Sequence, residues 1–212
     1  RVEHRGGCPL EEVIDLERAC SEGLLEVFPH DTLPAGDDGT KASEDFSKAA
    51  LANECGVGNI VWTVLFAYNH DTIKGGNPNT INDLFNTAKF PGKRALRKRP
   101  QVNMEWALIA DGVPKDKVYE VLATDAGQKQ AFAKLDSIKG DLVWFDSWSQ
   151  APQLLNEVAY GPTRTSSYAY VDKAVIPKLP SAHLDEGLKA SGVFWADYGE
   201  SLGEKFNEWL LN

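Results

Sequence analysis

The chain has few of the residues on which metal, redox and covalent chemistry usually depend. Its 212 residues include three cysteines and four histidines. The cysteines, at positions 8, 20 and 55, lack the spacing of a zinc site or of a Cys-x-x-Cys redox centre. Neither a His-Glu-x-x-His motif nor a Walker phosphate-binding loop is present. We therefore expect neither a metal nor a cofactor.

Long apolar stretches and an excess of positive charge are also absent. No apolar run approaches the roughly 18 residues that a membrane-spanning helix requires. Residues 1–10 contain no apolar core of a signal peptide, so a secreted origin would require that a leader had been removed or had never been included in this sequence. With 31 acidic and 22 basic side chains, the formal charge of −9 repels nucleic acid and anionic lipid at long range. The composition is otherwise ordinary for a globular protein.

Hydrophobic spacing predicts strands that alternate with helices. Residues 60–68 form a continuous apolar run, rich in β-branched and aromatic residues, which is typical of a strand buried on both faces of a sheet. Thr80 is placed to cap a short helix over residues 81–87. We also predict loops at 29–45 and 70–80, strands at 94–98 and 142–145, and helices at 11–27 (with Gly23 marking its end), after Pro100, and at 115–124, 126–139, 149–156, 168–179 and 196–211. This alternation indicates an α/β fold with helices on both faces of a sheet.

The segment from Lys89 to Gly112 carries the most information. It joins a Phe-Pro-Gly turn at residues 90–92, five cations within the seven residues 93–99, and an amphipathic helix with Glu105 near its start. A basic run of this kind is either a contact for nucleic acid or membrane, or a solvated strand and turn. Because the chain as a whole is acidic, we favour the solvated surface.

Several longer motifs in a fixed order resemble one known family. FPGKRALRK is followed by a helical stretch that begins NMEWALIADG, and the other motifs are ERACSEGLLE, NECGVGNIVWTVLFAYN, WFDSWSQAPQLLNE, YGPTRTSSY and FWADYGESLGEKFNEWL. Together they extend from about residue 15 to residue 210, and they resemble periplasmic solute-binding proteins of polyamine-type (spermidine/putrescine) ABC importers. The resemblance implies the α/β type II periplasmic-binding-protein fold, with a mixed sheet and helices on both faces. It also implies a periplasmic location and an inner-membrane ABC permease as partner.

The resemblance has two gaps. Family members have a first lobe whose opening strands and helices find no match before residue 11, and a long stretch that is missing here between Asn156 and Tyr160. We therefore expect the first lobe to be largely missing. The implied regions are a remnant of the first lobe at 1–58, a second-lobe α/β domain at 59–157 and C-terminal bracing helices at 158–212. Because such proteins bind by closing two lobes on the ligand, a shortened clamp should bind more weakly.

A binder of flexible diamines or triamines needs carboxylates for the ammonium groups and aromatic faces for the methylene chain. Glu105 follows the FPGKRALRK strand, where related proteins have a ligand-binding carboxylate, and Asp146 is a candidate for the second charge. The alternative for Glu105 is an ordinary solvent-facing helix glutamate, and the alternative for the tryptophans is packing in the core. The other candidate ligand-binding residues implied by the matched motifs are Trp148, Gln150, Tyr160, Trp195, Asp197, Asn59 and Trp62.

The resemblance also implies a disulfide between Cys20 and Cys55, because cysteines in the contexts RACSEG and NECGVG are paired in the family. The bond would close a loop of 34 intervening residues. The chain-entropy model values such a loop at about 3–4 kcal/mol, and the bond would require an oxidising compartment. From the residues alone, three buried thiols in a cytosolic protein are an equal alternative. Cys8 falls in a segment without a match.

These observations predict the extracytoplasmic solute-binding component of an ABC importer, which captures a small cationic solute such as putrescine or spermidine and is not an enzyme. An alternative ligand is 4-aminobutyrate or another amino acid, whose carboxylate would pair with Arg94 or Arg97. Further alternatives are a hydrolase that uses a carboxylate pair and a remnant that binds no solute. A homodimer through the face left by the missing lobe is a further predicted interaction.

Overall fold

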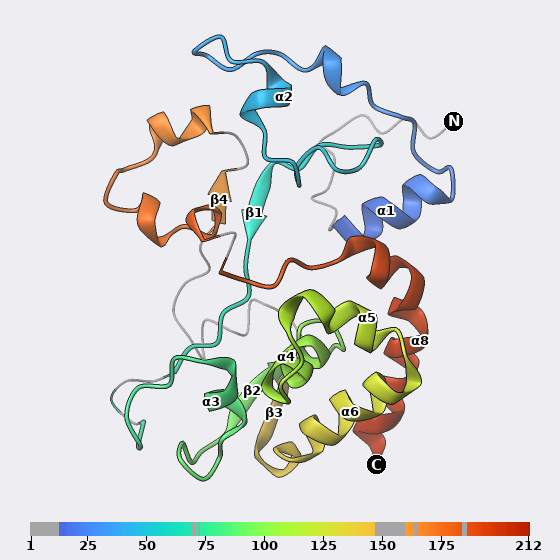
Figure 1. Cartoon of the computed structure of the whole chain (residues 1–212), viewed down its shortest axis with the longest axis vertical. Coiled ribbons are helices and arrows are strands. Elements are labelled where there is room, and N and C mark those ends of the chain that lie inside the picture. The colour runs from blue at the N-terminus through green and yellow to red at the C-terminus, as the bar shows by residue number, and fades with distance from the viewer. Residues whose placement is uncertain (1–12, 69–70, 72, 147–159, 163–164, 184–185) are drawn as a thin grey trace. The chain divides into compact units, whose positions relative to one another are not determined.

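The computed structural model describes residues 13–68, 71, 73–146, 160–162, 165–183 and 186–212. The chain divides into two compact units, each built from two segments that are distant in sequence. Unit 1 consists of Arg1–Thr63 and Ala159–Ala196, and unit 2 consists of Val64–Val158 and Asp197–Asn212. Figure 1 shows the elements of both units, coloured by residue number. The division into three regions stays a prediction.

Unit 1 contains short elements and one pair of strands. Strand β1 pairs with strand β4 in the antiparallel sense, with Val61 opposite Gly161. In chain order its described elements are α1 (Val13–Ser21), η1 (His30–Thr32), α2 (Ala42–Asp45), β1 (Ile60–Trp62), β4 (Tyr160–Pro162), η5 (Ser166–Tyr170), η6 (Ile176–Lys178), η7 (Pro180–Ala182) and the start of α8 (Gly192–Leu211), up to Ala196.

The first predicted helix ends where its glycine predicts. Gly23 adopts a φ of +70°, a left-handed conformation that glycine reaches without a steric cost. Its amide donates to the carbonyl of Cys20 at 3.0 Å, and the amide of Leu24 donates to the carbonyl of Ala19 at 2.9 Å. This is the Schellman arrangement, which satisfies carbonyl groups at the end of a helix. The predicted stop at Gly23 is therefore confirmed, although α1 itself is shorter than the range 11–27.

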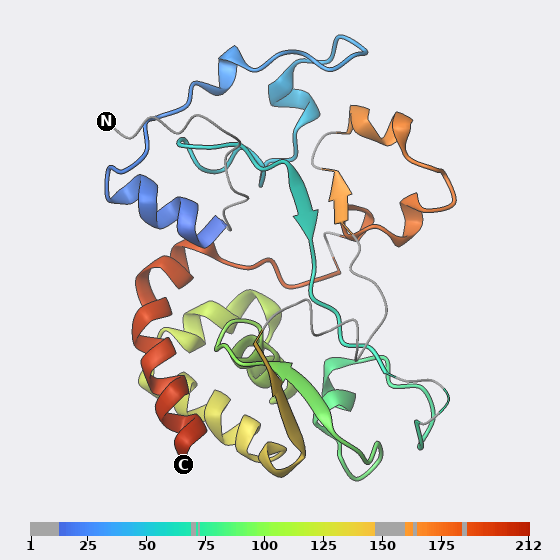
Figure 2. The ribbon, with the colours of Figure 1, turned by 180° about the vertical axis from the view of Figure 1, so that it is seen from behind.

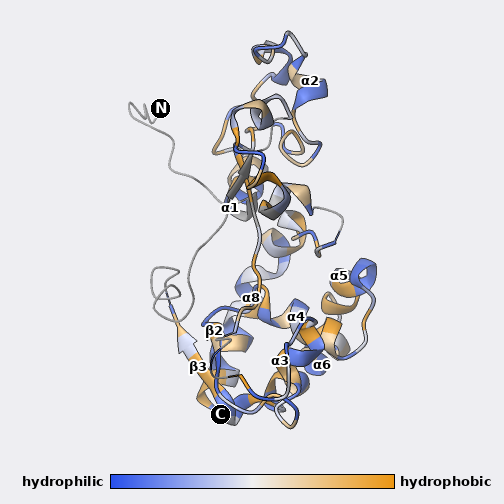
Figure 3. Ribbon diagram, turned by 90° about the vertical axis from the view of Figure 1, so that its left-hand side faces the viewer, coloured by the Kyte–Doolittle hydropathy of each residue, from blue (hydrophilic) through white to orange (hydrophobic). Residues whose placement is uncertain are grey.

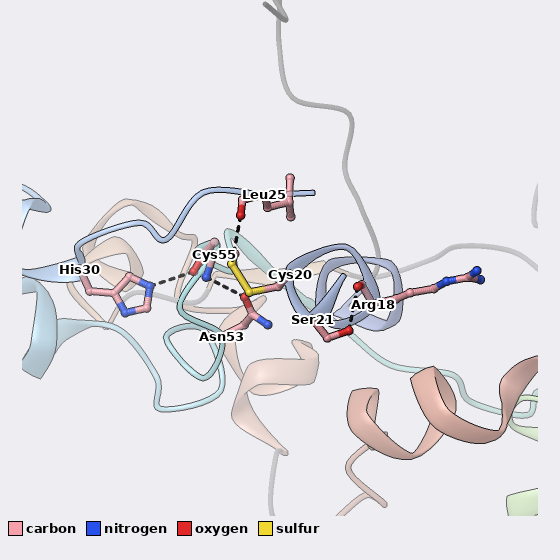
Figure 4. The surroundings of a disulfide bond; sticks show 8 residues. Arg18, Cys20, Ser21, Leu25, His30, Asn53 and Cys55 are labelled. Atoms are coloured by element: carbon pink, nitrogen blue, oxygen red, sulfur yellow. Dashed lines mark hydrogen bonds between the residues drawn. A yellow bond between two sulfur atoms is a disulfide. The ribbon is translucent and has the colours of Figure 1, made fainter. Parts of the chain in front are cut away.

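The predicted disulfide between Cys20 and Cys55 is present and ties α1 to the loop before β1. The two Cα atoms lie 5.8 Å apart. The side chain of Asn53 accepts a hydrogen bond from the amide of Cys55 at 2.8 Å, and a ring nitrogen of His30 lies 2.9 Å from the carbonyl of Gly56 (Figure 4). The loop before β1 is thus held by the disulfide to α1, by the contact with His30 and by its own bond between Asn53 and Cys55.

The long buried strand predicted over residues 60–68 is wrong in length and in burial. Strand β1 is three residues long, and its first residue, Ile60, is 38% exposed. Further along the same run, Leu65 is 75% exposed. A strand buried on both faces needs neighbouring strands and covering layers. In the described part of the chain, β1 has only the short strand β4 as a partner, so the apolar run has no sheet in which to bury itself.

Unit 2 is built on a parallel pair of strands joined by helices. Strand β2 pairs with strand β3 in register, with Arg97 opposite Phe145. A parallel pair needs a crossover connection, and three α-helices supply it here. The elements are α3 (Ile81–Phe85), β2 (Arg94–Arg97), α4 (Asn103–Ala110), η2 (Lys115–Lys117), α5 (Val118–Leu122), α6 (Asp125–Asp136), η3 (Lys139–Asp141), β3 (Leu142–Phe145) and, from Asp197 onward, α8 (Gly192–Leu211). Figure 2 shows this pair from behind.

The core of unit 2 lies between the crossover helices and α8. Helices α5 and α6 carry both hydrophobic and hydrophilic residues, as expected of helices with one buried face (Figure 3). Trp144 of β3 meets Phe206 of α8 edge to face, with ring centroids 5.6 Å apart. Among the described residues, the fully buried apolar side chains of this unit are those of Met104, Ala107, Leu108, Val118, Leu122, Ala131, Leu135, Ile138, Leu202 and Phe206. The buried face explains why these helices form at the places that their spacing predicts.

Local signals located most of the other elements correctly. Both predicted strands of unit 2 are present, and Thr80 caps α3 through a capping box with Asp83. The α/β class is confirmed. The predicted helix at 115–124 is split into η2 and α5. The predicted helix at 149–156 lies outside the described residues.

The helix predicted over residues 168–179 is wrong. This region contains the short 3₁₀ turns η5 and η6 instead. Asp172 accepts a hydrogen bond from the amide of Ala174 at 2.8 Å, a local bond that competes with helix formation. Pro177 lacks an amide hydrogen and disfavours helical geometry in the residue before it. Within the described residues, no helix combines the length and apolar character needed to cross a membrane.

We expect the disulfide to contribute measurably to stability. Replacing Cys20 by serine, or reducing the bond with dithiothreitol, should lower the free energy of unfolding by about 3–4 kcal/mol, because the unfolded chain gains the freedom of an open loop. Urea unfolding followed by circular dichroism measures the change. Cys8→Ser is the control, since it removes a cysteine without opening the bond. An unchanged midpoint in the Cys20→Ser variant would contradict this expectation.

Candidate functional site

The carboxyl edge of the parallel pair β2–β3 is the first candidate site. The amide of Lys98 donates to the carbonyl of Phe145 at 2.8 Å, so the strand pairing continues to the last residue of β3. Because the two strands are parallel and in register, the residues that follow them, Lys98 and Asp146, emerge at the same edge. In open α/β sheets this edge is where ligands bind.

Asn103 ties the start of helix α4 to this edge. Its side chain is buried, with 3% exposed, and the amide nitrogen donates to the carbonyls of Arg97 and Arg99, both at 2.7 Å. These two carbonyls belong to the last residue of β2 and to a residue just beyond it, and the carbonyl of Arg97 also accepts the amide of Arg99 at 2.8 Å. The buried side chain therefore stabilises the turn and fixes where α4 begins.

Glu105 lies in the first turn of α4 and is buried, with 4% of its surface exposed. The hydroxyl of Tyr119 donates to its Oε1 at 3.2 Å. Its neighbours in the helix, Met104 and Leu108, are fully buried apolar residues. The alternative of a solvent-facing glutamate is therefore wrong. A ligand would contact this carboxylate only after the side chains that cover it had moved, and its ligand-binding role stays a prediction.

Charges of both signs are exposed at this edge. Asp146 is exposed where β3 ends, and Lys98 and Arg99 are exposed where β2 ends. The helix N-terminus of α4 adds partial positive charge. The edge thus offers carboxylate and cationic groups to one bound molecule.

Arg94 does not lie free to pair with a ligand. It is 7% exposed, and its guanidinium donates to the carbonyl of Leu84 at 2.9 Å and to the carbonyls of Phe90 and Gly92. These contacts hold the Phe-Pro-Gly turn against the end of α3. The hypothesis that Arg94 binds a ligand carboxylate is therefore not supported, because backbone acceptors already use its donors.

The other predicted site residues are divided between the two units. Trp195 is 2% exposed, and its ring meets that of Phe194 edge to face at 5.3 Å. Trp62 and Tyr160 are opposite each other in the β1–β4 register, a juxtaposition that no short-range signal indicates. Asn59 in unit 1 and Asp197 in unit 2 are exposed, and Trp148 and Gln150 lie outside the described residues.

Unit 1 contains a surface hollow of about 330 Å³ that the sequence did not indicate. Three carboxylates and three hydroxyls line it, together with one alanine: Asp38, Glu44, Asp45, Thr40, Thr165, Ser166 and Ala169. The interpretation of residues 29–45 as a surface loop gave no reason to pair them with residues 165–169. The one available signal was the density of Asp, Gly and Thr in that loop.

Asp45 joins the two chain segments that form this hollow. It is 1% exposed, and its carboxylate accepts hydrogen bonds from the amide and the hydroxyl of Ser166, each at 2.7 Å. The amide of Thr165 donates to the carbonyl of Asp45 at 3.0 Å. The amide of Thr40 donates to Asp38, and this bond lowers the pKa of that carboxyl from its ordinary value.

Neither a metal site nor a covalent nucleophile emerges from the described geometry. Across the described ranges, no three His, Cys, Asp or Glu side chains are placed to hold a metal ion. A Gly-x-Ser-x-Gly pattern occurs at 199–203, but it lies within helix α8, and the hydroxyl of Ser201 donates to the carbonyl of Tyr198 at 3.1 Å. A nucleophile elbow requires a strand-to-helix turn, so this serine is not in one.

Nearly the whole chain matches one protein family. The model of the family described as bacterial extracellular solute-binding protein matches residues 11–211, which include most of both units. The chain belongs to this family of bacterial extracellular solute-binding proteins. The resemblance seen in the sequence is thereby confirmed at the level of the family, and its polyamine branch is not.

A curated relative of this solute-binding protein is the gamma-aminobutyric acid-binding protein of Pseudomonas aeruginosa. The two are 29% identical over 265 residues, which cover 92% of this chain and 73% of the relative. The alignment is longer than the 212 residues of this chain. The relative therefore carries residues between the matched segments that have no counterpart here.

Solved structures show the same fold. An ABC transporter substrate-binding protein from Bradyrhizobium japonicum has a TM-score of 0.76 and 21% identity, and covers 93% of this chain and 80% of its own. A protein described as the Atu4243-GABA receptor has a TM-score of 0.68 and 22% identity. The match covers 93% of this chain and 79% of that protein's chain. At these identities the likeness shows the fold alone. It confirms the periplasmic-binding-protein fold that the motifs implied.

We expect the bond between Ser166 and Asp45 to stabilise unit 1 of this solute-binding protein. Ser166→Ala should lower the free energy of unfolding by about 1–3 kcal/mol, because a buried carboxylate loses a donor. Ser167→Ala is the matched control, since the side chain of Ser167 makes no hydrogen bond within the described part of the chain. Urea unfolding of both variants measures the difference, and equal midpoints would contradict the expectation.

Proposed function

We propose that this chain captures a small zwitterionic amino acid of the 4-aminobutyrate type and delivers it to an ABC permease. One observation carries the proposal: a relative that aligns with 92% of this chain is named a gamma-aminobutyric acid-binding protein. A second protein with the same fold is also named for GABA. The alternative ligand considered from the sequence is therefore better supported than putrescine or spermidine.

The charges at the carboxyl edge of β2–β3 agree with a zwitterion. The exposed carboxylate of Asp146 can accept hydrogen bonds from an ammonium group. The exposed cations Lys98 and Arg99 emerge nearby, and Arg97 is the last residue of β2. An arginine forms paired hydrogen bonds with a carboxylate. A polyamine carries only positive charge, so the same cations would repel it.

Transport accounts for the family and the fold more simply than chemistry does. The matched family is described as solute-binding, and the fold relatives include an ABC transporter substrate-binding protein. The hydrolase alternative has only the presence of carboxylates to support it. The proposed location is outside the cytoplasmic membrane, where the disulfide between Cys20 and Cys55 is stable. The homodimer stays a prediction.

Thermal unfolding with candidate solutes tests the proposed function. The purified chain is heated alone and with millimolar 4-aminobutyrate, arginine, putrescine or spermidine. Ligand at 100 times its Kd should stabilise the folded chain by about 2.7 kcal/mol, which raises Tm by several degrees. We expect a shift with 4-aminobutyrate and none with the two polyamines. A shift with the polyamines alone would restore the polyamine interpretation, and no shift with any solute would remove the binding proposal.

Two aspartates at opposite ends of β3 test the location of the site. We expect Asp146→Asn to weaken binding of 4-aminobutyrate about tenfold or more, because a charge-assisted hydrogen bond to the ammonium is lost. Asp141→Asn is the matched control: Asp141 lies just before β3, at the other edge, 3.7 Å from Lys93. Isothermal titration calorimetry measures both affinities. Equal losses in the two variants, or none in either, would place the site elsewhere.

A further inference from the structure

Val102 has a backbone conformation that its side chain disfavours. Its φ is +74° and its ψ is −46°. In the part of the chain that the structure describes, every other residue with a positive φ is a glycine. For a β-branched residue this region is an outlier, because the branched side chain clashes with its own backbone. Such strain persists only where the surroundings over-determine the conformation.

Contacts on both sides of Val102 hold it in place. Before it, Pro100 is buried, and its carbonyl accepts the amide of Met104 at 3.0 Å. After it, Asn103 is fixed by its two bonds to the end of β2. The carbonyl of Val102 itself accepts the amide of Trp106 at 2.8 Å and so begins helix α4. The turn thus joins the strand end directly to the first helical turn.

A second costly feature lies in the same turn. The side-chain oxygen of Gln101 is buried and accepts no hydrogen bond within the described part of the chain. A buried acceptor without a donor is unfavourable, and most such atoms in proteins are satisfied. An ammonium group bound at this edge is a donor of the kind that this oxygen lacks. Two unfavourable features in adjacent residues therefore coincide with the edge where the solute is proposed to bind.

We infer that the strained turn at Val102 is a positioning element for the solute site. It sets the angle at which α4 leaves β2, and thereby the places of Gln101 and Glu105 relative to Asp146. The inference rests on the proposed function and names a residue that serves it without touching the solute. Sites of this kind need their binding groups held closely in place by residues behind them. The strained backbone of Val102 is thus the result of holding the binding groups in fixed places.

The test is Val102→Gly. Glycine adopts a positive φ without a clash, so Tm should stay the same or rise even though a half-buried side chain is lost. The first turn of α4 becomes freer, and affinity for 4-aminobutyrate should fall at least tenfold. Amide hydrogen exchange at Met104 and Trp106 should become faster, a readout that needs no ligand.

Val113→Gly is the matched control at the other end of α4. Val113 is also half-buried, but its φ is negative. This variant should lower Tm and leave affinity unchanged. If wild-type protein binds none of the four solutes, the proposed function fails. Two outcomes in a wild-type protein that does bind would overturn the positioning role. In the first, the Val102→Gly variant binds 4-aminobutyrate as tightly as the wild type. In the second, the Val102→Gly variant loses affinity and also loses Tm to the same extent as Val113→Gly.

Discussion

The carboxamide of Asn103 is the interaction on which the candidate solute site depends. It satisfies two carbonyls at and beyond the end of β2, and in doing so it fixes the first residue of α4. The parallel register with β3 then brings the residues after both strands to one edge. The charged groups assigned to the site in unit 2 lie at the ends of these two strands, so their places depend on this junction. The strained conformation of Val102 is the backbone geometry that the junction imposes.

Unit 1 is stabilised differently from unit 2, because its described part has little regular structure with which to bury a core. Its strands are three residues long, and its helices are short. Covalent and polar links replace sheet packing: the disulfide between Cys20 and Cys55, and the buried carboxylate of Asp45 that bonds to Ser166. A relative that aligns over more residues than this chain contains has additional segments between the matched ones. In this chain, the disulfide and the bonds of Asp45 join segments of unit 1 that are distant in sequence.

The choice between a polyamine and an amino acid depends on charge of both signs. A diamine requires carboxylates only, whereas a zwitterion requires a carboxylate and a cation at a fixed distance. The edge of β2–β3 presents Asp146 with Lys98 and Arg99, and the curated relative is named for a zwitterion. The guanidinium of Arg94, one of the two cations predicted for the ligand carboxylate, donates instead to three backbone carbonyls. The basic run is therefore part structural support and part exposed charge.

Local patterns in the sequence determined the places of several elements and some of their ends. Gly23, Thr80 and the two strands of unit 2 act through neighbouring residues, so short-range spacing was sufficient to predict them. The family motifs determined the fold and the cysteine pair. Only the tertiary structure decided that Glu105 is buried, that residues 60–68 are not a buried strand, and that Asp45 and Ser166 meet across 121 positions. Burial depends on which distant segments cover a residue, and spacing along the chain carries no record of that.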